Sequence, residues 1–96
     1  MKKVSAIICT LNEEKTLRNV IMAVWEYFPI NEIVVVSNGS TYNTKNIINE
    51  LKQFIEFKDI HLAENKGKEY AMIVGAEIAS GEILVFRFKR TIAAIN

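Results

Sequence analysis

Two short apolar runs constrain the fold of this chain more than any other feature. Val4–Cys9 and Glu32–Ser37 are dense in Val, Ile and other apolar residues, with Ile33–Val36 an unbroken apolar block. Such runs are typical of strands that are buried on both faces of a parallel sheet. The segment between them repeats apolar residues at helical spacing and ends before Pro29. Strand, helix and strand in this order predict a right-handed crossover connection.

The same alternation continues along the chain. Further strands are expected at Ile60–Ala63 and Glu82–Phe86, each preceded by a helix. The first of these helices is expected to carry on its inner face Ile47, Ile48, Leu51, Phe54 and Ile55. The second is expected to carry on its inner face Ala71, Val74, Gly75 and Ile78. The predicted fold class is α/β, with three layers: a mostly parallel four-stranded sheet between helices on both faces. We expect one partial domain over residues 1–90, followed by an apolar tail at 91–96.

Composition excludes several classes of protein. Twelve basic and eleven acidic side chains give a net charge of +1, which is no signature of nucleic-acid binding. No apolar stretch approaches the length of a membrane span. A lone cysteine, Cys9, cannot form an intramolecular disulfide, so a cytoplasmic location is expected. We expect Cys9 itself to be a buried, inert thiol.

Polar segments follow each predicted strand, and parallel α/β sheets bind their ligands at these carboxyl ends. They are Thr10–Glu13, Ser37–Thr41, Glu64–Lys68 and Arg87–Arg90, and the first three suit close approach of a ligand. Each of them alone also fits an ordinary helix cap or turn. No G-x-G-x-x-G motif follows the first strand, and Gly67-Lys68 lacks the Ser or Thr of a phosphate-binding P-loop.

Three of these segments together resemble a known family. Cys9–Glu14 is similar to a P-x-x-N-E-E segment except at Cys9. Ser37–Thr44 is similar to a D-x-G-S-x-D-x-T turn that has lost its carboxylates. The spacing of residues within Asn65–Glu82 matches a third segment of the same pattern. In this order, over residues 4–86, they resemble the amino-terminal half of a family 2 glycosyltransferase of the GT-A fold, a nucleotide-diphospho-sugar transferase.

The resemblance implies that the domain binds a nucleotide-sugar donor, a UDP- or GDP-sugar. The residues it assigns to the donor are Thr10, Leu11, Asn12, Glu13, Asn38, Gly39 and Lys68. Thr10, Leu11 and Glu13 would hold the base and ribose, with Glu13 accepting hydrogen bonds from sugar hydroxyls. Asn38 would read an edge of the base, and Lys68 would face the diphosphate. The alternative for Lys68 is a solvated surface lysine.

The family's metal motif is missing. Its fourth strand ends in D-x-D, which holds Mg²⁺ or Mn²⁺, but here Phe88 and Arg90 occupy those positions. The sole aspartate, Asp59, is expected at the start of the third strand. We therefore expect no metal cofactor, assign no catalytic residue, and expect no metal-dependent sugar transfer by this chain alone. The basic residues of Arg87–Arg90 either pair with the diphosphate directly or form a solvated strand end.

Because the chain ends at Asn96, before an acceptor-binding half, we expect a truncated domain. Two alternatives stay open. One is an interaction or structural remnant of the same fold that binds no nucleotide, and the other is a piece that needs a second chain. We also expect a closed, symmetric homodimer that uses the fourth strand or the tail.

Overall fold

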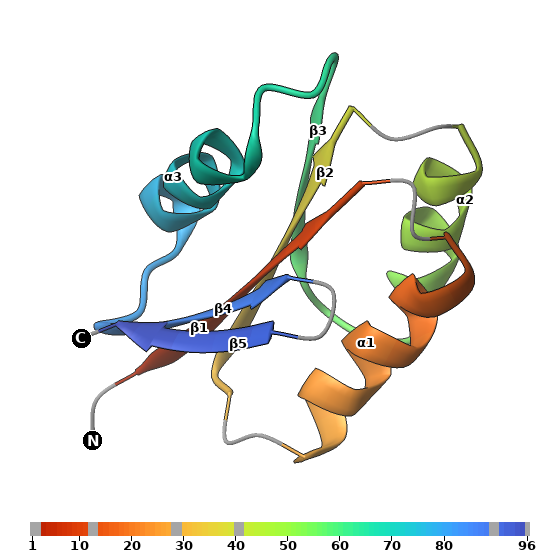
Figure 1. The fold of residues 1–96 in the computed structure, drawn as a ribbon. Helices are drawn as coiled ribbons and strands as arrows, with labels where there is room; N and C mark the ends of the chain where they lie inside the picture. Colours follow the sequence, from red (N-terminus) through yellow and green to blue (C-terminus); the bar gives the residue numbers. More distant parts are fainter. Residues whose placement is uncertain (1–2, 12–13, 28–29, 40–41, 89–90, 96) are drawn as a thin grey trace.

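The computed structural model describes residues 3–11, 14–27, 30–39, 42–88 and 91–95 (Figure 1). Strands and helices alternate as the sequence predicts, which confirms the α/β fold class. In chain order the elements are β1 (Val4–Thr10), α1 (Glu14–Tyr27), β2 (Glu32–Asn38), α2 (Tyr42–Leu51), β3 (Lys58–Leu62), α3 (Lys68–Ile78), β4 (Ile83–Phe88) and β5 (Thr91–Ile95).

The sheet has five strands in the order β3-β2-β1-β4-β5. β2 and β4 both pair with β1 in parallel, and β3 pairs with β2 in parallel. β5, which we expected as a tail, pairs antiparallel with β4, with Phe88 opposite Thr91. The two strands follow each other so closely that they form a hairpin. β4 is therefore not a free edge, and β5 takes that place.

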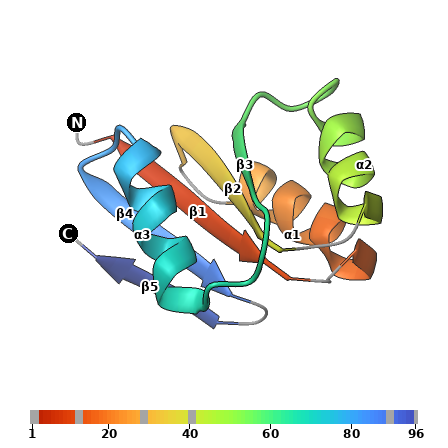
Figure 2. The same ribbon diagram turned by 90° about the horizontal axis from the view of Figure 1, so that it is seen from above.

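Helices cover both faces of the sheet, with α1 and α2 on one side and α3 on the other (Figures 1 and 2). Alternate residues of β1 serve two separate cores. Ala6 and Ile8 pack with α1 and α2, whereas Ile7 packs with α3. α3 approaches the sheet closely at Gly75, where a Cβ atom would lie 2.5 Å from Cγ2 of Ile7. None of the helices in the described part of the chain is long and apolar enough for a membrane span.

Some side chains predicted to face inward do not. Phe54 is 80% exposed, because α2 ends at Leu51 and Phe54 lies in the turn that follows. Ile55, which was also predicted to face inward, is buried at 4% exposure, and Phe57 packs into the core at 7%. Ile78, in the last turn of α3, is 37% exposed. Apolar spacing predicted these helices correctly but not their last turns.

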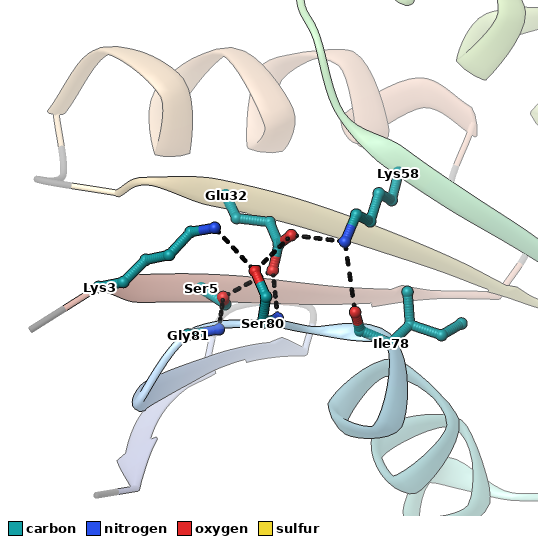
Figure 3. Close-up of polar contacts among 7 residues, drawn as sticks. All are labelled: Lys3, Ser5, Glu32, Lys58, Ile78, Ser80 and Gly81. Carbon is teal, nitrogen blue, oxygen red and sulfur yellow. Dashed lines mark hydrogen bonds and ion pairs between the residues drawn. The ribbon is translucent and has the colours of Figure 1, made fainter.

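A polar network centred on Glu32 ties the amino ends of the strands together (Figure 3). Its carboxylate accepts hydrogen bonds from the Ser5 hydroxyl at 2.8 Å and from the Ser80 amide at 2.8 Å. It also pairs with Lys58 Nζ at 2.7 Å. The Ser5 hydroxyl in turn accepts from the amide of Gly81 at 2.9 Å. The network thereby joins β1, β2 and β3 to the turn between α3 and β4.

This environment shifts the acidity of Glu32. Its side chain is only 10% exposed, and burial alone would raise the pKa. The ion pair with Lys58 and the hydrogen bonds from Ser80 and Ser5 outweigh burial and lower the pKa to about 2 from its ordinary value of 4.5. A depressed carboxylate pKa stabilises the folded state above the unfolded pKa, and that stabilisation is lost as the pH falls from about 4.5 toward 2.

We predict that Glu32→Gln lowers the free energy of unfolding at pH 7 by about 2 kcal/mol, because it breaks charge-assisted hydrogen bonds and removes the carboxylate that pairs with Lys58. The loss should be smaller at pH 3, where the wild-type carboxylate contributes less. Urea denaturation at both pH values measures this, with Glu77→Gln on the exposed side of α3 as control. An equal loss at both pH values would contradict the role given to the charge.

Candidate functional site

The loops that follow β1, β2 and β3 meet at one edge of the sheet. β1 and β2 end level with each other, with Thr10 opposite Ser37, and Asn38 is opposite Leu62 of β3. Side-chain hydrogen bonds then connect Asn38 to the loop of residues 64–67. This juxtaposition is the one that the sequence predicted. Asn12 and Glu13, which were assigned to the donor, lie outside the described residues.

Thr10 and Asn38 lie on opposite faces of this edge. Along β1, Thr10 continues the series of Ala6 and Ile8 toward α1 and α2, whereas Asn38 continues the series of Val34 and Val36 toward α3. Thr10 is only 2% exposed. Its neighbour Leu11 is 38% exposed and presents an accessible side chain at this end of β1.

Asn38 is almost completely buried and holds the loop before α3. Its Nδ2 donates to Oδ1 of Asn65 at 3.0 Å and to the carbonyl oxygen of Gly67 at 3.2 Å. Its Oδ1 accepts from the amide of Lys66 at 3.1 Å, and Oδ1 of Asn65 also accepts from the amide of Gly67 at 2.9 Å. We call Asn38, Asn65 and these bonds the amide clasp. Asn38 was expected to contact an edge of the nucleotide base. Its Nδ2 group instead donates both of its hydrogen bonds to the loop before α3.

Gly39 lets the loop approach the end of β2. Its φ is +77°, and a Cβ atom there would lie 2.4 Å from the nitrogen of Asn65 and 2.7 Å from the carbonyl carbon of Glu64. A side chain at this position would collide with the backbone of the loop. The absence of a side chain at Gly39 therefore lets the backbone of this loop lie directly beside the end of β2.

Lys68 is the first residue of α3 and is exposed at this same edge. It follows Gly67, the residue that caps the helix and that the amide clasp holds. The neighbouring loop carries mixed charges: Lys66 lies 3.9 Å from the carboxylate of Glu64 and 5.5 Å from the ring centre of Tyr70. The amino end of a helix favours anions and Lys68 adds positive charge there, whereas Glu69 in the same first turn opposes it.

Cys9 lies in β1 beside Thr10, but its thiol is unsuited to chemistry. Burial raises its pKa to about 11, so it is protonated at neutral pH. This agrees with the expectation of an inert thiol, although Cys9 is half-buried rather than fully enclosed.

The residues at the end of β4 do not fit a divalent cation. The family's two aspartates are replaced by Phe88, which ends β4, and by Arg90, which lies outside the described residues. Asp59 lies in β3 and is bound to Lys52 and, at 3.0 Å, to His61. In the part of the chain that the structure describes, no three His, Cys, Asp or Glu side chains gather into a metal site. Hard cations need such oxygen ligands.

A cavity of about 320 Å³ lies at the opposite edge, at the amino ends of the strands. Two of its charged side chains, Glu32 and Lys58, already pair with each other. The full lining comprises Lys3, Trp25, Asn31, Glu32, Ile33, Glu56, Phe57 and Lys58. It shares no residue with the loops that converge at the carboxyl edge.

Comparison with known proteins identifies relatives of this arrangement. The family model for glycosyl transferase family 2 matches residues 5–87. The chain is 32% identical over 83 residues to a poly-beta-1,6-N-acetyl-D-glucosamine synthase of Staphylococcus epidermidis, covering 85% of this chain and 20% of that protein. It is 36% identical over 67 residues to the synthase of the same name from Staphylococcus aureus strain COL, a match that covers 70% of this chain and 16% of that protein. The chain thus spans about a fifth of the length of these relatives.

Solved structures share the fold. The mannosyltransferase PcManGT from Pyrobaculum calidifontis, in complex with GDP-Man and Mn²⁺, superposes with a TM-score of 0.79 and 26% identity, over 88% of this chain and 26% of that one. TarS 1–349 of S. aureus in complex with UDP superposes with a TM-score of 0.74 and 29% sequence identity, over 88% of this chain and 26% of that one. With a family match that covers most of its length and the loops of the sheet in their expected places, this chain belongs to glycosyl transferase family 2.

Proposed function

We propose that this domain binds the nucleotide of a nucleotide-sugar donor at the carboxyl edge of its sheet. The observation that carries the proposal is the convergence of three loops there, held by the amide clasp beside the start of α3. The fold is shared with a mannosyltransferase whose structure contains GDP-Man and with TarS, whose structure contains UDP. These two likenesses support a nucleoside diphosphate as the ligand class.

The proposed roles follow from where each residue lies. Leu11 offers an exposed apolar surface for the base. For Glu13 the proposal rests on the family resemblance, which makes it an acceptor for sugar hydroxyls, and Asn12 is assigned to the same donor site on that ground. Thr10, which is buried, supports this end of β1. Asn38 and Gly39 hold the loop before α3. Lys68, with the first turn of that helix, takes the diphosphate.

Binding is proposed to need no divalent cation, because Phe88 and Arg90 replace the carboxylates that would hold one. For the same reason we propose no metal-dependent sugar transfer by this chain alone. The alternative is a remnant of the fold, with a structural or interaction role, that binds no nucleotide. A direct measurement of nucleotide binding distinguishes the two.

Calorimetric titration of UDP, GDP and their sugars, with and without Mn²⁺, is the test. We expect binding of equal affinity in both conditions. Lys68→Ala should weaken it about tenfold, because one charge-assisted contact to phosphate is lost. Lys52→Ala, at the other edge of the sheet, is the matched control. Absence of binding would favour the remnant, and strong enhancement by Mn²⁺ would contradict the metal-free site.

We also propose that the chain forms a symmetric dimer through β5. The two edge strands differ in sequence: β3 carries Lys58, Asp59 and His61, whereas Thr91–Ile95 has no charged residue. Charged side chains on an edge oppose pairing with another chain, and an edge without them permits it. Two copies of β5 running antiparallel about a two-fold axis would close the contact.

Sedimentation at micromolar concentration should therefore show a dimer. Ala93→Lys places a charge in the middle of β5 and should shift the protein to monomer without removing the strand, and deletion of residues 91–96 should do the same. A wild-type monomer, or a dimer that survives both changes, would contradict this interface.

A further inference from the structure

We infer that Asn65 is a positioning residue of this site, and that with Asn38 it makes the loop before α3 depend on a carboxamide at position 38. The part of the inference that concerns the loop applies to the protein without ligand. The part that concerns nucleotide affinity rests on the proposed function.

The groups that face the Asn38 side chain define what it must supply. Two are acceptors, Oδ1 of Asn65 and the carbonyl oxygen of Gly67, and one is a donor, the amide of Lys66. A carboxamide provides two N–H groups and one oxygen, which matches this set. A carboxylate has acceptors only, and it would place oxygen against oxygen at the two positions that are now hydrogen-bonded at 3.0 and 3.2 Å.

The surrounding bonds fix the orientation of both amides. The Lys66 amide donates to Oδ1 of Asn38, so Asn38 cannot turn over without losing that bond. Oδ1 of Asn65 accepts from Gly67 N–H as well as from Asn38, so turning Asn65 would break two bonds at once. In these contacts Asn65 acts only as an acceptor, whereas Asn38 acts mainly as a donor.

The clasp controls where α3 begins. Gly67 caps this helix, and it is held through its carbonyl oxygen by Asn38 and through its amide by Asn65. The loop also lies close to the end of β2 at Gly39, where a Cβ atom would be 2.4 Å from the nitrogen of Asn65. Lys68 follows Gly67 directly, so its distance from the ends of β1 and β2 is set by two neutral side chains. Asn38 itself is only 5% exposed, so a carboxylate introduced at this position would be largely withdrawn from water.

The same chemical change at the two clasp positions should therefore have opposite results. Asn38→Asp removes both donors and should raise hydrogen exchange at the Lys66 and Gly67 amides about tenfold or more. Asn65→Asp keeps the acceptor oxygen and should preserve their protection, whereas Asn65→Ala should lose it. Asn49→Asp, on the exposed side of α2, controls for added charge. Equal effects of Asn38→Asp and Asn65→Asp would overturn the inference.

Nucleotide affinity provides the second readout. For whichever of UDP or GDP the wild type binds, Asn65→Ala should weaken binding about tenfold while thermal unfolding still shows a folded domain. Unchanged affinity in Asn65→Ala, with exchange at Gly67 increased, would contradict the positioning role and leave the proposed function standing. If the wild type binds neither nucleotide, the proposed function fails, and the exchange comparison still decides whether the clasp exists.

Discussion

Burial of both faces of β1 and β2 is the constraint on which this structure depends. Val34, Val35 and Val36 are all 0% exposed, although they point alternately to opposite sides of the sheet. Each such side chain contributes about 2 kcal/mol when it leaves water, more than the local preferences of the backbone. Helices must then cover both faces, and the crossover connections that place them there make the strands parallel. Parallel strands bring their following loops to one edge, where the candidate site lies.

The two edges of the sheet are held by different chemistry. At the amino edge, the ionised carboxylate of Glu32 gathers Lys58, Ser5 and Ser80. At the carboxyl edge, Asn38 and Asn65 hold the loop before α3 with neutral groups. A carboxylate in that place would repel a diphosphate, whereas neutral amides add no further negative charge to those of Glu64 in the loop and Glu69 in the first turn of α3. The charged network thus lies at the edge away from the proposed ligand.

Elements that form mainly because their residues are buried were predicted well from the sequence. Features that depend on residues far away in the sequence were not. β1 was expected at Val4–Cys9 and spans Val4–Thr10, because an apolar run needs only burial to become a strand. Phe54 was placed wrongly, since apolar spacing continued past the end of α2 with no glycine or proline to mark it. Thr91–Ile95 became a strand through β4, its partner. Asn38 was assigned to the site, but its contacts depend on Asn65, which is 27 residues away.

The central claim is that the carboxyl edge of the sheet, and not the cavity at the amino edge, binds a nucleoside diphosphate. Backbone amide NMR during titration with UDP and with GDP tests it most directly. We predict that the affected amides belong to residues 10–11, 38–39 and 64–69, with those of Glu32 and Ser80 unchanged. Shifts confined to residues that line the amino-edge cavity, such as Trp25 and Phe57, would contradict the account.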